Sequence, residues 1–351
     1  MNKTAITAII LLLLAAVPIS VCIVKHPDTI ALEKRKISPL PHCPSSLAAK
    51  RVKRFFREFE SYYNDRMLGR SALLRLSNLI YDKGKTDQNP NKCYRGRDNW
   101  LFLGNDYDRC VDALTGKWKP SAQELANQLQ FFTEVKKIVQ ESGAEFHMLI
   151  GPNKSTIYPE YLPPLTFPAK KRCITPAVEQ LKAGGISIFD STETLLENKD
   201  KGLLYFRSDT HWNNLGAKVA LERFLKETGL AVLPSVELVP AKKHKGDLVN
   251  IGGYKNFPLA TGDNFTPHWV DESEKKVSDK TVLVLGDSFS GALMYYLSGM
   301  YKNVYRIHYK QVAIKKSKMS TLANYLQKLE KKPDIVLWIQ VERIFAHWGT
   351  D

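Results

Sequence analysis

The sequence predicts an α/β protein whose central β-sheet is mostly parallel and carries helices on both faces. Short runs of aliphatic and β-branched residues alternate along the chain with longer stretches in which apolar residues recur at helical spacing. This alternation is typical of βαβ units. The run at 281–285 is apolar or β-branched throughout, as expected for a buried strand. With 351 residues, the chain can form one large domain or two.

The N-terminal segment predicts export. An apolar run at 5–24 follows Lys3 and precedes Lys25, and it is long enough to span a bilayer. We interpret residues 1–25 as an uncleaved signal anchor. A cleaved signal peptide is the alternative, although no Ala-x-Ala cleavage site is present. Residues 26–46 are rich in proline and charge and are interpreted as a stalk, which leaves 47–351 as the main domain.

The first half of this domain contains a strong helix signal. Ser121 and Glu124 form a capping box and Gly143 follows, which predicts a helix at 121–142. Aromatic residues at helical spacing predict an earlier helix at 47–81, with a stripe that faces a core. The other elements expected here are a turn and strand at 94–103, strands at 144–150, 186–189 and 203–206, and a short helix at 176–182.

The second half begins with a helix that Asn213 or Asn214 caps and that ends near residue 228. The segment 230–267 is loop-rich, and we interpret 230–275 as a lid or substrate-binding insertion. The remaining elements expected are strands at 281–285, 304–309 and 334–339 and helices at 289–300 and 317–331.

A serine with a histidine and an aspartate indicates nucleophilic catalysis. Ser288 follows the strand at 281–285 through a turn at Gly286, so its hydroxyl is expected at the carboxyl edge of the sheet. Serine needs a base and an orienting group. Asp209 and His211 are two positions apart, and in an extended segment such side chains point to the same side. We therefore predict Ser288 as nucleophile, His211 as base and Asp209 as its partner.

Four loops are expected to meet at this edge, because ligands of such folds lie outside the carboxyl ends of the strands. They contain Asn153, Asp209 to His211, Ser288 and residues 341–343. For the oxyanion we propose the Ser288 N–H and Asn153. Candidates for binding substrate are aromatic residues that could stack on a substrate ring and arginines that could pair with carboxylates, although packing and structural ion pairs are the alternatives: Trp212, Tyr254, Trp269, Arg207 and Arg343.

The cysteines fit an exported protein. Beyond Cys22 there are four, Cys43, Cys93, Cys110 and Cys173, which allow two disulfides. We favour a Cys93–Cys110 pair. The chain has no Cys-x-x-Cys pair, which argues against a zinc site.

Two other classes of partner are disfavoured. Asp209 and His211 could ligate a metal only with further partners, and His244, Asp247 and His268 lie at no recognised spacing, so we predict no metal. The formal net charge of +15 would attract nucleic acid, anionic lipid or acidic polysaccharide. The basic residues are spread along the chain and form no known nucleic-acid-binding motif, so we predict no nucleic-acid partner.

Several blocks in a fixed order give the chain a family resemblance. They are residues 55–74, 96–102, 152–160, 209–213, 246–248 and 286–290. Together they resemble the alginate O-acetyltransferases of the AlgX/AlgJ kind, a branch of the SGNH hydrolase-like proteins. Asp209 and His211 precede Ser288, whereas common SGNH hydrolases have the reverse order, so the motif order is permuted as in this family. The chain looks closer to the shorter, membrane-anchored AlgJ-like members.

The resemblance implies a three-layer SGNH hydrolase-like catalytic domain over 47–351 and a Ser288, His211 and Asp209 triad without a cofactor. It also implies a periplasmic enzyme, anchored to the inner membrane or secreted if cleaved, that acetylates an exopolysaccharide such as alginate. The acetyl donor would be a membrane-bound O-acyltransferase partner, since an exported domain meets no acetyl-CoA. A carbohydrate acetylesterase and a non-catalytic scaffold of an export complex remain the alternatives.

Overall fold

The structure, a computed structural model, describes residues 29–30, 35–43, 49–66, 89–164, 166–254, 257–276, 278–312 and 319–348. The chain divides into two compact units, one formed by 1–88 with 250–257 and the other by 89–249 with 258–351. Within the smaller unit lie β1 (Thr29–Ile30), β2 (Arg35–Lys36) and α2 (Ala49–Arg66). The helix predicted at 47–81 is thus seen over 49–66, and its remaining C-terminal part lies outside the described residues.

The larger unit is built on a five-stranded parallel sheet, which confirms the predicted fold class. Its strand order is β10 (Tyr301–Ile307), β9 (Ser278–Gly286), β11 (Ile335–Val341), β5 (Glu145–Gly151) and β6 (Ser187–Asp190). All four pairings are parallel. The carboxyl ends of these strands therefore meet at one edge. Because β11 lies between β9 and β5, the segment that follows it is central to that edge.

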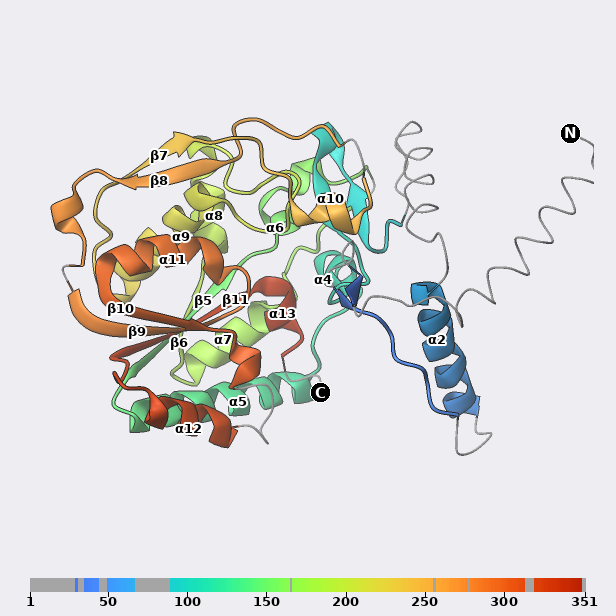
Figure 1. Ribbon diagram of the computed structural model, residues 1–351, viewed down its shortest axis with the longest axis horizontal. Coiled ribbons are helices and arrows are strands. Elements are labelled where there is room, and N and C mark those ends of the chain that lie inside the picture. The colour runs from blue at the N-terminus through green and yellow to red at the C-terminus, as the bar shows by residue number, and fades with distance from the viewer. Residues whose placement is uncertain are drawn as a thin grey trace, which may run out of the picture. The chain divides into compact units, whose positions relative to one another are not determined.

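Helices cover both faces of the sheet, which gives the three layers (Figure 1). Val282 and Val284 of β9 pack into one core with α9 (Asn214–Thr228) and α11 (Ser290–Met300). Leu283 and Leu285 point to the other face and pack with α5 (Ala122–Glu141), α7 (Thr175–Ala183) and α12 (Met319–Lys328). Successive side chains of a strand point to opposite faces, so a strand buried on both must be apolar throughout.

The predicted helix caps are present. The Ser121 N–H donates to Glu124 Oε2 at 2.6 Å, and the Glu124 N–H donates to Ser121 Oγ at 3.3 Å. Gly143 follows the helix with φ +88°. Asn213 caps α9, where its side chain accepts from the Gly216 N–H at 3.0 Å.

Several short elements surround the sheet. The segment 93–103 forms an antiparallel pair, β3 (Cys93–Arg95) and β4 (Leu101–Leu103), where a turn and one strand were predicted. The short helices are α4 (Cys110–Thr115), α6 (Lys154–Ile157), α8 (Thr192–Glu197), α10 (Asp247–Ile251) and α13 (Glu342–Ala346). The 3₁₀ turns are η1 (Arg97–Asn99), η2 (Pro159–Tyr161), η3 (Lys199–Lys201), η4 (Glu272–Glu274) and η5 (Tyr309–Gln311).

The strand predicted at 203–206 is wrong. Only an isolated bridge between Tyr205 and Trp212 occurs there. The Leu204 N–H donates to the Tyr158 hydroxyl at 2.9 Å, and the Leu204 carbonyl accepts from the Asn213 N–H at 3.0 Å. Because these backbone groups are used locally, the segment turns back on itself and does not join the sheet.

The segment predicted to be loop-rich, 230–267, contains regular structure. β7 (Val236–Pro240) and β8 (Phe265–Trp269) pair antiparallel over five residues. The Asp263 side chain accepts from the Arg207 N–H at 2.9 Å, and the Asp263 carbonyl accepts from Asn213 Nδ2 at 2.9 Å. These bonds attach the end of the segment to the chain on either side of residues 209–211.

The favoured disulfide is also wrong. No disulfide joins any two of the cysteines that the structure describes, Cys43, Cys93, Cys110 and Cys173. The Cys110 thiol instead donates to the carbonyls of Leu103 and Gly104, at 3.2 and 3.1 Å. Burial raises the pKa of Cys110 to about 12, which keeps this thiol protonated at neutral pH.

Among the described residues, no helix has the length and apolar character needed to cross a membrane. The predicted signal anchor at 1–25 and parts of the stalk at 26–46 lie outside those residues.

Removal of the α5 cap should destabilise the larger unit. For Ser121→Ala we expect a loss of about 1 kcal/mol in the free energy of unfolding, since the Glu124 N–H loses its acceptor. Urea unfolding followed by circular dichroism measures this. Ser121→Asn keeps a capping oxygen and is the matched control. Equal loss in both variants would contradict a role for the capping bond.

Candidate active site

The nucleophile candidate Ser288 lies in the turn between β9 and α11, where it is exposed. A Cβ atom at Gly286 would lie 2.6 Å from the Ser290 side chain, so the turn requires glycine there. The buried Asp287 carboxylate accepts from the Phe289 N–H and the Val341 N–H, both at 2.8 Å. These bonds fix the turn against the end of β11, so the hydroxyl of Ser288 has a defined place at the sheet edge.

The predicted triad residues are brought together. His211 Nε2 lies 2.7 Å from Ser288 Oγ, and His211 Nδ1 lies 2.5 Å from Asp209 Oδ1. When Nδ1 donates to the carboxylate, Nε2 is left as an acceptor for the serine hydroxyl. The geometry is therefore that of a base poised to take the Ser288 proton.

Asp209 is a buried carboxylate with four hydrogen-bond donors. Besides His211 Nδ1, Oδ1 accepts from the His211 N–H at 3.1 Å. Oδ2 accepts from His244 Nε2 at 2.9 Å and from the Asp247 N–H at 3.0 Å. Burial by itself raises the pKa of Asp209, but the hydrogen bonds from His211 and His244 outweigh it and hold this pKa well below its ordinary value. Asp209 is therefore an anion at neutral pH.

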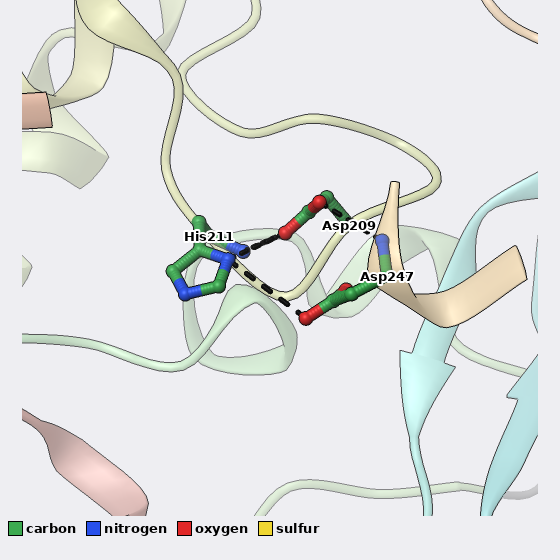
Figure 2. Close-up of side chains that lie close together, drawn as sticks. All are labelled: Asp209, His211 and Asp247. Atoms are coloured by element: carbon green, nitrogen blue, oxygen red, sulfur yellow. Dashed lines mark hydrogen bonds and ion pairs between the residues drawn. The ribbon is translucent and has the colours of Figure 1, made fainter. Parts of the chain in front are cut away.

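Asp247 lies beside Asp209 and His211 (Figure 2) and binds Thr210, the residue between them. Its Oδ1 accepts from the Thr210 N–H at 2.9 Å, and its Oδ2 accepts from the Thr210 hydroxyl at 2.7 Å. Oδ2 also lies 3.9 Å from His211 Nδ1.

Asp209, His211 and Asp247 could offer ligand atoms within 4.8 Å of one another, which raises the question of a metal ion. The atoms that face one another in this cluster already make hydrogen bonds, since Nδ1 donates to Asp209 and Asp247 accepts from Thr210. A metal ion would have to displace these bonds. We therefore interpret the cluster as a hydrogen-bonded support for the His211 ring.

Lys154 is a buried cation that contacts the catalytic loop, and its role was not predicted from the sequence. Its Nζ donates to the carbonyls of Phe206, Arg207 and Asp209, at 3.1, 3.0 and 2.6 Å. Burial lowers the pKa of Lys154 to about 8, against the opposing effect of Asp209 and Asp247. These three bonds attach residues 206–209 to the loop that follows β5, which is how a segment outside the sheet reaches its edge.

Glu342 joins the other loops at this edge. Its Oε2 accepts from the Asn153 N–H and from the Thr156 hydroxyl, both at 2.7 Å. Its Oε1 accepts from Arg172 Nε at 3.0 Å, and Arg172 Nη1 pairs with Asp190 Oδ2 at 2.6 Å. The ends of β5, β6 and β11 are thus tied together, in agreement with the predicted common rim.

An open hollow of about 240 Å³ contains the triad. It is lined by Phe206, Asp209, His211, Trp212, His244, Ser288, Phe289 and Ala292. Trp212 was predicted to stack on a sugar, but its indole is only 1% exposed and Nε1 donates to the Phe289 carbonyl at 3.0 Å. The ring is a wall of the hollow, so the stacking prediction is wrong for Trp212.

Trp269 is placed away from the hollow. Its ring stacks on Tyr295 at 5.8 Å and contacts the backbone of Gly299, where a Cβ would lie 2.0 Å from the indole. Gly299 is near the C-terminal end of α11, about 15 Å along the helix from the Ser288 turn. Trp269 therefore lies outside the hollow that contains Ser288, and its predicted role in binding substrate stays a prediction.

Of the other predicted residues in the larger unit, none lines the hollow. Arg207 Cζ lies 5.9 Å from the Trp100 ring centre, whereas Tyr254, in the smaller unit, is buried with its ring 5.6 Å from Phe257. Asn153 and Arg343 line a separate cavity of about 160 Å³ together with Glu342. Arg343 Nε lies 3.7 Å from Asp108 Oδ2. The position of Asn153 by itself does not support a contact with the oxyanion. The positions of the other three residues do not by themselves support a contact with substrate.

Comparison with known proteins identifies the family. The family described as "SGNH hydrolase-like domain, acetyltransferase AlgX" matches residues 93–339. The chain belongs to this family. The match contains the whole sheet apart from the last two residues of β11, together with Asp209, His211 and Ser288.

Curated relatives and one solved structure are also similar to this chain. The probable alginate O-acetylase AlgJ of Pseudomonas aeruginosa is 26% identical over 204 residues, 55% of this chain and 49% of that protein. The AlgJ of Pseudomonas syringae is 25% identical over 171 residues, 47% and 40% of the two chains. The chain thus spans about half the length of these curated relatives or less. The O-acetyltransferase domain of Pseudomonas putida AlgJ shares the fold, with a TM-score of 0.52 at 22% identity over 72% of this chain and 92% of that one.

Loss of the Asp209 charge should disable Ser288. We expect Asp209→Asn to slow labelling of Ser288 by phenylmethanesulfonyl fluoride by roughly 10³–10⁴-fold, since His211 loses the carboxylate that orients its ring. Intact-mass spectrometry over time measures this rate. Asp279→Asn, at an exposed position of β9, is the matched control. Labelling of Asp209→Asn at the wild-type rate would refute the triad.

Proposed function

We propose that this chain is an exported O-acetyltransferase that moves acetyl groups onto hydroxyls of an exopolysaccharide through an acetyl-Ser288 intermediate. The observation that carries the proposal is the line of hydrogen bonds from Ser288 through His211 to Asp209, set in a hollow open to solvent. Membership in the acetyltransferase AlgX family supports acetyl as the group transferred.

The first half-reaction forms the acetyl-enzyme. Ser288 Oγ attacks the acetyl carbonyl carbon of the donor while His211 Nε2 takes the hydroxyl proton. The carbonyl electron pair moves onto oxygen, and Asp209 stabilises the imidazolium. When the tetrahedral intermediate collapses, the bond to the leaving group breaks and His211 returns its proton to that group.

The second half-reaction delivers the acetyl group. A sugar hydroxyl attacks the carbonyl carbon of acetyl-Ser288, and His211 takes the hydroxyl proton. Collapse of this intermediate breaks the bond to Ser288 Oγ, which recovers its proton from His211. The products are an O-acetylated sugar and free enzyme.

We assign the Ser288 N–H as the hydrogen-bond donor to the oxyanion of both intermediates. The next two amides are engaged, since the Phe289 N–H donates to Asp287 Oδ1 and the Ser290 N–H donates to the Asp287 carbonyl. The Ser288 N–H has no acceptor within the part of the chain that the structure describes, and it lies at the start of α11. The lining of the hollow gives Asn153 no support as a second donor. One such donor typically contributes a factor of about 10²–10³ in rate.

Acceptor, donor and location are proposed from the relatives and the sequence. The names of the curated relatives make alginate or a similar polymer the proposed acceptor. The net charge of +15 favours an acidic polymer, and the candidates to contact its carboxylates are Arg207 and Arg343, which lines the cavity of about 160 Å³. We propose a membrane-bound O-acyltransferase as donor and an inner-membrane anchor at residues 1–25 that holds the chain in the periplasm.

Hydrolysis is the second candidate function, because Ser288 is exposed and the hollow is open to water. The same triad would then act as a carbohydrate acetylesterase, with water as acceptor. The two functions differ only in whether a sugar hydroxyl displaces water at acetyl-Ser288.

The test is to incubate the protein with a chromogenic acetyl ester, with and without alginate oligosaccharides, and to count acetyl groups on the sugar by mass spectrometry. We expect acetylated sugar with wild type and with the exposed control Ser273→Ala, and a loss of at least about 10³-fold with Ser288→Ala, which lacks the nucleophile. Ester cleavage without sugar acetylation would favour the esterase. No ester cleavage by folded wild type would overturn both catalytic functions.

A further inference from the structure

A second histidine contacts the proposed catalytic carboxylate. His244 Nε2 lies 2.9 Å from Asp209 Oδ2, whereas His211 Nδ1 lies 2.5 Å from Oδ1. The carboxylate is thus shared between two imidazoles, one of which contacts the nucleophile. Neither the triad nor the mechanism above uses His244.

The position of His244 is built by close packing. Its ring lies against Phe206, with centroids 4.2 Å apart, and its carbonyl accepts from the Ser208 hydroxyl at 3.1 Å. The Gly246 N–H donates to the same hydroxyl at 3.2 Å. A Cβ at Gly246 would lie 2.1 Å from the Ser208 carbonyl oxygen, so the segment 244–247 lies directly on the backbone of the catalytic loop.

His244 is also accessible. Its side chain is 35% exposed, and it lines the same hollow as Ser288. It can therefore exchange protons with solvent, in contrast to Lys154, which is 4% exposed. His244 binds Oδ2 of Asp209, whereas the His211 ring binds Oδ1. The protonation state of His244 can therefore change how strongly the carboxylate attracts a proton on His211.

We propose that His244 is a positioning residue that orients Asp209 and, through its own charge, sets the strength of His211 as base and acid in the proposed acetyl transfer. The inference rests on the proposed function for its kinetic effect. When both imidazoles are protonated, they share a single negative charge. A protonated His244 then makes His211 a weaker base toward Ser288 and a stronger acid toward the leaving group.

The charges around His244 favour its protonated form. The hydrogen bond to Asp209 raises the pKa of His244, burial opposes it, and the carboxylates of Asp263 and Asp247 act in the same direction as Asp209. The positively charged residues next to His244 in the sequence are Lys243 and Lys245. Because its pKa is raised, His244 keeps its proton to higher pH than an ordinary histidine does.

The test compares His244→Gln, a neutral donor, with His244→Ala, which leaves Oδ2 only the Asp247 N–H, in the full chain. Both are assayed for ester turnover between pH 5 and 9. We expect His244→Ala to lower kcat about 10-fold with KM for a small ester unchanged. We expect His244→Gln to restore most of kcat at pH 8, with the acid limb of kcat about one pH unit above that of wild type. The acid limb moves to higher pH because, without a protonated His244, His211 no longer shares the negative charge of Asp209 with a second cation and holds its proton more tightly.

A measurement without turnover separates this proposal from the proposed function. The downfield ring proton of His211 on Nδ1, observed by NMR, should show an additional titration step in wild type that is absent in His244→Gln. The exposed His268→Gln is the matched control and should keep both the step and the acid limb. An unshifted acid limb in His244→Gln, or an unchanged His211 proton titration, would overturn the proposal, even where the wild type is fully active. An inactive wild type that still shows the extra step would overturn only the proposed function.

Discussion

The buried charge of Asp209 is the constraint on which the rest of the site depends. Moving an isolated carboxylate from water into a protein interior costs several kcal/mol of solvation free energy. Such a group therefore stays charged inside a protein only where hydrogen-bond donors surround it. Asp209 has four, from His211 Nδ1, the His211 N–H, His244 and the Asp247 N–H. The segments 209–211 and 244–247 therefore form one structural unit. The place of the His211 ring, and hence its contact with Ser288, follows from the need to satisfy this one anion.

The same principle holds the whole edge of the sheet together. Parallel strands end in loops whose backbone groups are partly buried and cannot all pair within the sheet. Three buried charged side chains supply the partners: Lys154 for residues 206–209, Asp287 for the Ser288 turn and the end of β11, and Glu342 for the loop after β5. Each bridges segments that are far apart in sequence. The site is thus positioned by charges that do no chemistry themselves.

Local signals account for what the sequence could predict. The buried strand at 281–285 is apolar on both faces, the capping box at Ser121 uses residues three apart, and the two-residue spacing of Asp209 and His211 suffices to place them on one side. These features need no knowledge of distant segments.

The features that the sequence did not predict correctly depend on partners that lie far away along the chain. Lys154 in sequence is an ordinary polar loop residue, and nothing local shows that three carbonyls from 52 to 55 positions away surround its ammonium group. His244 was considered only as a metal ligand, because its contact with Asp209 needs the fold. Trp212 is of a residue type that often stacks on sugars, but in the fold its indole N–H donates to the Phe289 carbonyl. The segment at 203–206 has the composition of a strand, but Tyr158 and Asn213 use its backbone groups.

The size of the hollow constrains how transfer could prevail over hydrolysis. A volume of about 240 Å³ lies below the range of about 300–1,000 Å³ that is usual for small-molecule sites. A stretch of polymer must therefore extend beyond the hollow. The triad can therefore set the rate at which acetyl-Ser288 forms and breaks, but it cannot hold the polymer. If the chain is a transferase, most contacts that bring a sugar hydroxyl to Ser288 ahead of water must lie outside the hollow, and substitutions there should change the ratio of transfer to hydrolysis more than they change ester cleavage.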